Sequence, residues 1–397
     1  MKTYVWALYA SLLLYSCGAN STNRQDNKED ASTEQTQKAK KEQGLVTLDV
    51  TKDYPEKKIV LQDLADVKYI PLETKKNALL PNSAGCLGYV SDSLIVARTS
   101  DNEIVLFNGD GSVRSSFRHV GQAVDPKAQE IFIVDYLLKY RMQVYSFTGQ
   151  YKRTLPIPYK MILNSLQDFS ADCLLACDMD VNQGISNRAK PYMLLSKKTG
   201  EIVKELDIHF TKRMSNRMSK PFGENQTISA ALGYDPIVRC EDSYVIGDLS
   251  ADTIYTYTPQ GVLSPMLVRT PPVLSMETPK VLLPDYRAGS YFFFYLVDFE
   301  FDFETRTGFP DKYMVYDYAA GKTYVCKLVN RDCEEQEIQL GDGGVTNKAW
   351  NTACYTIPSS DLVEQSEAGK VHGPLKEIAA GRTDDDNPVL AIVRFKN

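Results

Sequence analysis

Histidine is scarce in this sequence, which has only three copies among 397 residues. His119, His209 and His372 stand far apart, and none belongs to an H-E-x-x-H motif, which argues against a zinc-hydrolase centre. A G-x-S-x-G motif is also absent, which argues against the nucleophile elbow of an α/β-hydrolase. The sequence therefore predicts no catalytic residue, no metal site and no cofactor.

Basic stripes and long apolar runs are lacking as well. The sequence has 45 Lys and Arg against 51 Asp and Glu, a net charge of −6. Phosphate binding needs a concentrated positive surface, so nucleic acid is excluded as a partner. Beyond the N-terminus the most apolar stretch is residues 291–297, which is too short for a membrane helix and stops at Asp298.

The N-terminus carries an export signal. Lys2 supplies positive charge, and residues 4–15 form an apolar stretch too short to span a bilayer. Ser16 and Cys17 then end the stretch as a bacterial lipoprotein signal ends. We expect residues 1–16 to be removed and Cys17 to carry acyl chains, which together bind a membrane durably. This predicts an outer-membrane lipoprotein facing the periplasm or the cell surface. The alternative is an ordinary secretory signal with a chance cysteine.

Residues 17–44 after this signal are polar. From Gly18 to Gly44 there is no aliphatic side chain larger than Ala and no aromatic one. Such a segment cannot bury enough apolar surface to offset the entropy lost on ordering. We expect residues 17–44 to be a flexible tether and residues 45–397 to be the folded body.

The body shows a two-residue period, in short segments rich in β-branched and aromatic residues. Five such segments lead into a glycine that is followed by another β-forming residue, as tight hairpins require. These glycines are Gly111, Gly149, Gly200, Gly261 and Gly321. Their spacing is close to the length of a four-stranded propeller blade, and the chain ends can complete a sixth unit. The sequence predicts an all-β, six-bladed β-propeller closed by pairing of its N-terminal and C-terminal strands. We expect residues 389–395 to pair in the same blade as strands from residues 59–74.

Several motifs resemble those of a known family. Residues 69–74 (YIPLET), residues 132–135 with 141–145, and residues 385–396 are similar to segments of the six-bladed β-propeller lipoproteins of Bacteroidetes, whose blades are NHL-like. The resemblance implies a propeller fold in the cell envelope, with largely unknown function. Where many members carry a G-x-G-P-G-E-type loop, this chain has residues 119–126 (HVGQAVDP).

Two functional hypotheses follow from this fold. The favoured one is a non-catalytic binding or scaffold protein that presents a face or the central channel to a glycan, peptide or protein. The alternative is a propeller enzyme, a lyase or glycoside hydrolase, acting on saccharides. A Tyr or His, an Arg and two carboxylates at one channel mouth would favour the enzyme, whereas an apolar and hydroxyl lining would favour the binder.

Other candidate sites have simpler interpretations. The alternating acids Asp298, Glu300, Asp302 and Glu304 are expected to form a solvated strand face, because same-face neighbours on a strand stand too far apart to share an ion. The acids at 384–386 fit a turn before the closing strand. Most of the seven cysteines after Cys17 are expected to be buried, and a disulfide among Cys326, Cys333 and Cys354 is left open.

Two hydroxyl residues are candidates for O-glycosylation. Ser93 and Thr253 each follow Asp and precede an aliphatic residue, which resembles the site that Bacteroidetes modify on exported proteins. Asp followed by Ser or Thr is also a common turn before a strand, so a plain turn remains the alternative.

Overall fold

The computed structural model describes residues 44–396, apart from 82–85, 100, 102, 118–122, 136–139, 159–160, 180–187, 223–225, 241–242, 335, 341–346 and 349–351. Residues Leu45–Asn397 form one compact unit. None of the described helices is long and apolar enough to cross a membrane.

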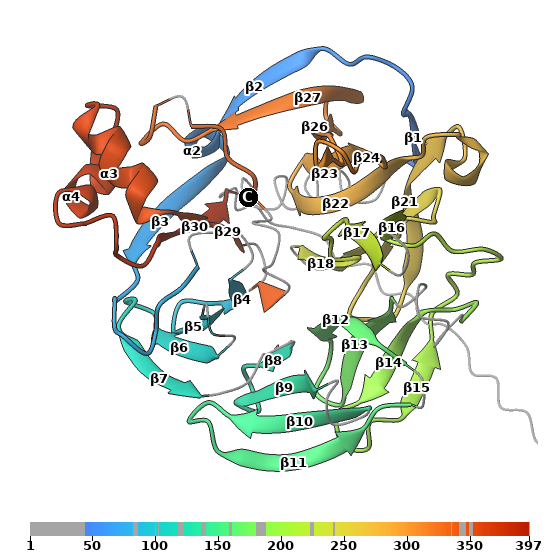
Figure 1. Ribbon diagram of the computed structural model, residues 1–397, viewed down its shortest axis with the longest axis horizontal. Helices are drawn as coiled ribbons and strands as arrows, with labels where there is room; N and C mark the ends of the chain where they lie inside the picture. Colours follow the sequence, from blue (N-terminus) through green and yellow to red (C-terminus); the bar gives the residue numbers. More distant parts are fainter. Residues whose placement is uncertain are drawn as a thin grey trace, which may run out of the picture. The chain divides into compact units, whose positions relative to one another are not determined.

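Short strands rich in β-branched and aromatic residues form six blades of antiparallel strands, which are arranged around a common centre (Figure 1). The first three blades, from the innermost strand outwards, are β4 (Leu87–Val90), β5 (Leu94–Arg98), β6 (Ile104–Asn108) and β7 (Val113–Phe117); β8 (Ala123–Asp125), β9 (Glu130–Asp135), β10 (Arg141–Ser146) and β11 (Tyr151–Pro156); and β12 (Leu163–Asp168), β13 (Cys173–Asp178), β14 (Tyr192–Ser196) and β15 (Ile202–Glu205).

The other three blades are β18 (Ile237–Cys240), β19 (Ser243–Ile246), β20 (Thr253–Tyr257) and β21 (Leu263–Thr270); β22 (Lys280–Ala288), β23 (Tyr291–Asp298), β26 (Asp311–Asp317) and β27 (Lys322–Val329); and β29 (Thr352–Ile357), β30 (Val389–Phe395) and β3 (Ala65–Pro71). The predicted six-bladed propeller is confirmed.

The five predicted hairpin glycines all have a positive φ. The angles are 87° at Gly111, 78° at Gly149, 76° at Gly200, 79° at Gly261 and 63° at Gly321. Each glycine lies between the third and fourth strands of its blade, where the tight turn requires a left-handed backbone that a side chain would disfavour. The hairpin prediction is confirmed.

Ring closure joins the two ends of the body. β3 pairs antiparallel with β30 over its whole length, from Ala65 opposite Phe395 to Pro71 opposite Val389. The predicted pairing of residues 389–395 with an N-terminal strand is therefore confirmed. Helices α3 (Ser359–Glu367) and α4 (Gly373–Ala379) are inserted before β30, and a 3₁₀ turn, η1 (Val273–Ser275), follows β21.

The segment before β3 runs along the outside of two further blades. β1 (Val46–Asp49) pairs in parallel with β21, and β2 (Glu56–Val60) pairs in parallel with β27. The short helix α2 (Leu61–Leu64) then leads into β3. We call β1, β2 and β3 the N-terminal strap. The expectation that residues 59–60 share the closing blade is wrong, because β2 completes the neighbouring blade as a fifth strand.

The direction of the strands gives the ring two different faces. Each blade starts at its innermost strand, so the turns after the first and third strands lie at one face, the end face. The turn after the second strand and the connection to the next blade lie at the other, the start face.

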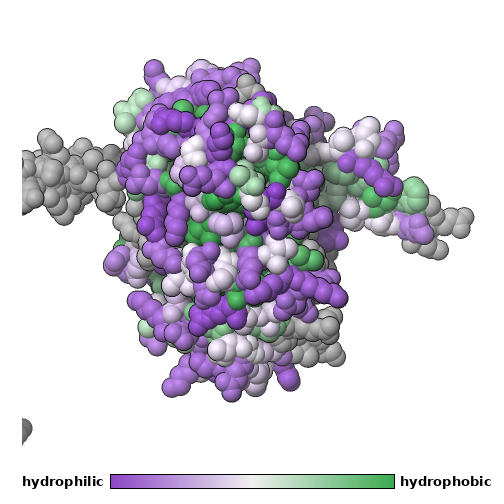
Figure 2. Space-filling view, turned by 90° about the vertical axis from the view of Figure 1, so that its left-hand side faces the viewer, coloured by the Kyte–Doolittle hydropathy of each residue, from purple (hydrophilic) through white to green (hydrophobic). Residues whose placement is uncertain are grey.

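Figure 2 shows that the surface seen from the left-hand side of Figure 1 is mostly hydrophilic, with hydrophobic residues scattered among the polar ones.

The acids at 298–304 do not lie on one strand as expected. β23 ends at Asp298, and the Glu300 N–H donates a hydrogen bond to the Asp298 carbonyl (2.9 Å), which turns the chain. A separate hairpin of β24 (Phe301–Asp302) and β25 (Thr307–Gly308) follows. Glu300, Asp302 and Glu304 are exposed, in agreement with the expected solvation.

The cysteines are structural in the part of the chain that the structure describes. None of the seven described cysteines forms a disulfide, and all but Cys173 are buried. The disulfide left open among Cys326, Cys333 and Cys354 does not form.

Candidate functional site

Long insertions gather on the start face of blades 4 and 5. β16 (Arg217–Phe222) and β17 (Gln226–Ala231) form a hairpin between blades 3 and 4, and the β24–β25 hairpin lies between β23 and β26. Residues at the bases of both hairpins, among them Leu232 and Phe299, pack against one buried cluster around Leu249 and Val281. Lys220 and Glu304, one from each hairpin, form an exposed ion pair at 3.9 Å.

A pocket of about 110 Å³ lies beside the β24–β25 hairpin. We call it the start-face pocket. Its walls come from the end of β1 and the chain that follows, and from the strand ends of blade 5, and they consist of Val50, Thr51, Lys52, Asp53, Lys280, Leu296, Asp298, Pro310, Asp311 and Lys312. Three lysines and three aspartates therefore surround a small apolar base.

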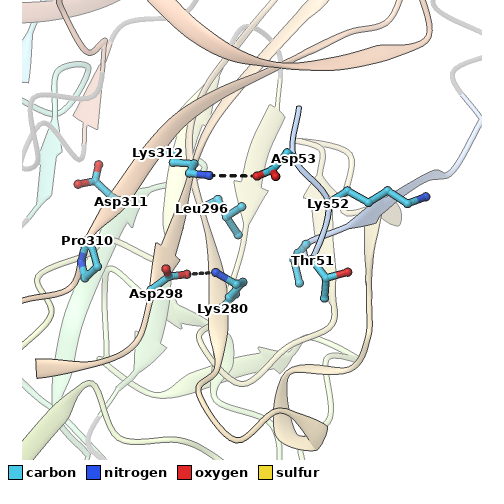
Figure 3. Close-up of a pocket in the computed structure, with 10 residues that line it drawn as sticks. Thr51, Lys52, Asp53, Lys280, Leu296, Asp298, Pro310, Asp311 and Lys312 are labelled. Atoms are coloured by element: carbon cyan, nitrogen blue, oxygen red, sulfur yellow. Dashed lines mark hydrogen bonds and ion pairs between the residues drawn. The ribbon is translucent and has the colours of Figure 1, made fainter. Parts of the chain in front are cut away.

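Two ion pairs cross this pocket, as Figure 3 shows: Lys280 with Asp298 and Lys312 with Asp53. In that view Lys52 and Asp311 extend away from both pairs. The side chains of Lys312 and Asp53 are 56% and 101% exposed and 3.7 Å apart. An ion pair this exposed contributes about 1 kcal/mol or less. A ligand with charged groups can therefore replace the Lys312–Asp53 contact at small cost.

A second polar group lies at the end face, between blades 2 and 3. The Lys197 ammonium is 2.6 Å from a carboxylate oxygen of Asp125 and 2.5 Å from one of Asp168. Burial raises the pKa of Asp168, although Lys197 opposes the shift. Burial also raises the pKa of Tyr89, on which the charges of Arg239, Asp168 and Asp125 act. We call these five residues the end-face ion cluster.

The cluster contains the residue types expected of an enzyme, namely a Tyr, an Arg and two carboxylates. Both carboxylates are bound by Lys197, however, whose side chain is 7% exposed. Asp125 and Tyr89 are also buried. Because Asp125 and Asp168 end the innermost strands of neighbouring blades, the lysine joins those blades electrostatically.

The centre of the ring is partly filled by the chain itself. β28 (Asn347–Lys348) pairs in parallel with the inner edge of β4 and also contacts β18 and β29. Figure 1 shows it as the orange arrow beside β4, inside the ring. A ligand at the centre would have to share this space with the β28 backbone.

The other predicted site residues are dispersed. Cys17 and His119 lie outside the described residues. His209 is exposed, and His372 Nε2 lies 2.8 Å from Glu334 Oε1. Ser93 is exposed in the turn before β5, whereas Thr253 is half-buried at the start of β20. Among the described residues no group of three His, Cys, Asp or Glu could hold a metal ion.

The fold defines the protein as an all-β, six-bladed propeller. The family model DUF5128, described as a 6-bladed beta-propeller, matches residues 35–345, and the chain belongs to this family of unknown function. No curated protein matches the sequence.

The solved structures that resemble this chain are distant in sequence. An exported protein of Bacteroides fragilis superposes with a TM-score of 0.57 at 12% identity, covering 89% of this chain and 100% of that one. Virginiamycin B lyase of Staphylococcus aureus gives 0.40 at 10% identity, covering 84% of this chain and 100% of that one. A Bacteroides thetaiotaomicron protein of unknown function gives 0.36 at 11% identity, covering 83% and 76%. The likeness to the Bacteroides fragilis protein concerns the fold alone.

Proposed function

We propose that this protein is a non-catalytic binding protein of the cell envelope, held at the outer membrane through Cys17 and binding a glycan, peptide or protein partner at the start face of blades 4 and 5. The observation that carries the proposal is the start-face pocket beside two projecting hairpins. Surface loops that a rigid scaffold positions are the usual place for binding residues. The Bacteroides fragilis protein with a similar fold is an exported protein, which is compatible with an envelope location for this chain.

A combined binding and turnover screen tests the proposal. The purified full-length protein is offered glycans and peptides, and each binder is retested with Lys280→Ala and Lys312→Ala. We expect binding without turnover, and at least a tenfold loss of affinity in both variants. The matched control is Lys327→Ala, because Lys327 forms a similarly exposed ion pair with Glu56 (2.7 Å) on the outer strands of the same blade. Equal affinity in pocket and control variants would show that the ligand binds elsewhere.

The end-face ion cluster supports the second candidate, a propeller enzyme acting on saccharides. If the screen detects turnover, Asp168→Asn and Tyr89→Phe should abolish it, because a partly buried carboxyl with a raised pKa and a phenol are suited to proton transfer. Turnover that survives both changes would remove this cluster as its source.

Ser93 is also proposed as an O-glycosylation site. Its exposure in a turn leaves room for a glycan, whereas the half-buried Thr253 is less accessible. The intact mass of the native protein should exceed that of the bare lipidated chain, and Ser93→Ala should abolish the excess while Thr253→Ala keeps it. A native mass equal to that of the bare chain would exclude the modification.

A further inference from the structure

β17 is an exposed strand whose outer edge pairs with no other described strand. Its six residues, Gln226 to Ala231, include no charged residue and no proline, and four of them are exposed. Free strand edges invite pairing with another chain, and proteins usually protect them with charged residues or proline. Every other described edge strand of four or more residues on the outside of the molecule has such protection: Arg114 on β7, Lys152 on β11, Lys204 on β15, Asp49 on β1, Lys58 on β2, Lys68 on β3 and Pro221 on β16.

The hydrogen-bond pattern shows which groups of β17 point outwards. At the base of the hairpin the Leu232 N–H donates to the Asn216 carbonyl (2.8 Å), so these two residues form a hydrogen-bonded pair. Bonded and non-bonded pairs alternate along antiparallel strands. Ser219 opposite Ser229 is therefore a non-bonded pair. It follows that Thr227, Ser229 and Ala231 direct their N–H and C=O groups to the open edge.

The same alternation explains the protection of β16. Pro221 lies opposite Thr227, also in a non-bonded pair. Its missing N–H would have pointed away from β17, so the proline removes a donor from the outer edge of β16 without weakening the hairpin. The two edges of one hairpin are thus unlike: the β16 edge is blocked and the β17 edge is open.

We propose that β17 is the contact through which two copies of this protein associate, by antiparallel pairing across a two-fold axis. A second copy fits because its own β17 edge is equally uncharged, so no charge is opposed or left unpaired. With the axis at Ser229, this residue faces Ser229 of the second copy, and Thr227 faces Ala231 of the second copy. All the outward N–H and C=O groups of the two strands are then paired.

The side chains at this edge permit close approach. Thr227, Ser229 and Ala231 are small, and the hairpin contacts the rest of the molecule through the cluster at its base and through the Lys220–Glu304 ion pair on β16. The proposed contact uses a single six-residue strand from each copy, whereas stable complexes typically bury roughly 1,200 Å² or more. The two copies therefore associate weakly in solution, and the proposal is independent of the ligand proposed for the start-face pocket.

Sedimentation velocity of the full-length protein in mild detergent, over a range of concentrations, tests the pairing. The parent should shift from monomer to dimer. Ser229→Pro removes one outward N–H and should raise the dimer dissociation constant at least tenfold. Ser219→Pro is the matched control, because Ser219 is the cross-strand partner of Ser229 and the two hydroxyls share one hydrogen bond (2.9 Å). It alters the edge that Pro221 already blocks, so dimerisation should persist.

A charge exchange keeps the test decisive if proline disturbs the hairpin. Ser229→Lys places like charges opposite each other and should give a monomer, as should Ser229→Glu. Mixing the two variants should restore the dimer, since opposite charges then face each other. A parent that stays monomeric throughout, an equal effect of Ser219→Pro and Ser229→Pro, or a mixture that stays monomeric would overturn the proposal.

Discussion

Asn387 fixes the segment that follows β3. Its side-chain N–H groups donate to the carbonyls of Glu73 (2.8 Å) and Ala78 (2.7 Å), and its oxygen accepts from the Leu80 N–H (2.8 Å). Asn387 is 2% exposed, so these backbone groups would be unsatisfied without it. The YIPLET motif and the acidic turn at 384–386 thus meet at the ring closure, which gives both a structural role.

Gly200 and Gly321 test the cost of a side chain at a hairpin turn. Both have positive φ, where a Cβ costs about 1–2 kcal/mol. At Gly200 a Cβ would lie 2.1 Å from the Pro156 carbonyl oxygen, whereas at Gly321 nothing lies within 4 Å. Gly200→Ala should therefore lower the free energy of unfolding more than Gly321→Ala does, as measured by urea denaturation. Equal losses would contradict the close contact.

Glu130 should make stability depend on pH. Arg153 donates two hydrogen bonds to its carboxylate (2.6 and 2.7 Å), and these, with Lys152, lower the pKa of Glu130 from 4.5 to about 2. Because folding lowers this pKa, the stabilisation is fully present above about pH 4.5 and is lost as the pH falls through about 2.

Urea denaturation at several pH values checks this dependence. Glu130→Gln should reduce the free energy of unfolding by about 2 kcal/mol at pH 7, and the difference from the parent should shrink towards pH 2. Glu201→Gln, at an exposed turn, is the control and should change little. A difference between Glu130→Gln and the parent that is constant from pH 7 to pH 2 would refute the argument.

The residue patterns predicted the backbone conformation better than they predicted which side chains meet in the folded protein. The turn glycines could be found because tight hairpins impose a local requirement. Lys197 could not, because it lies 72 residues from Asp125 and 29 from Asp168 and meets both only when blades 2 and 3 pack. The start-face pocket was missed for the same reason, since Asp53 and Lys312 belong to segments that only the folded ring brings together.

At the scale of elements, two strands of the N-terminal strap are added to complete blades, whereas the third is itself part of a blade. β1 and β2 are fifth strands on blades that already have four, whereas β3 and β30 are two of the three strands of blade 6. The sequence predicted the closure because β3 and β30 lie at the two ends of the body. The alternating pattern of residues 46–60 does not specify which blade a strand joins, so the outer pairings of β1 and β2 could not be predicted.

Removal of the last ten residues should therefore unfold the body. The deletion takes all of β30, which lies between β29 and β3, and so breaks the ring. We expect the cooperative thermal transition, followed by circular dichroism, to disappear. A chain shortened at the N-terminus through Val50 loses only β1 and should keep the transition at a lower temperature. A C-terminal truncation that melts like the parent would refute ring closure as the source of cooperativity.

At the scale of the whole molecule, membrane attachment depends on the proposed acylation of Cys17. Cys17→Ala should release the protein into the soluble fraction, because no other segment provides an anchor in this proposal. Cys173→Ala, at a half-exposed cysteine within β13, should leave the protein in membranes. Cell fractionation with washing measures both, and a Cys17→Ala protein that withstands the wash would rule out the anchor.

The strap also sets an order of events during synthesis. Val46 precedes its partner Leu267 by several blades, and Ala65 must wait for Phe395, which follows it after all the other blades. Contacts so distant in sequence slow folding. The first strands made therefore remain without partners until β21, β27 and β30 have been made, and the ring cannot close before then. A prematurely terminated chain would expose unpaired strands, which are the structures that proteases and chaperones recognise.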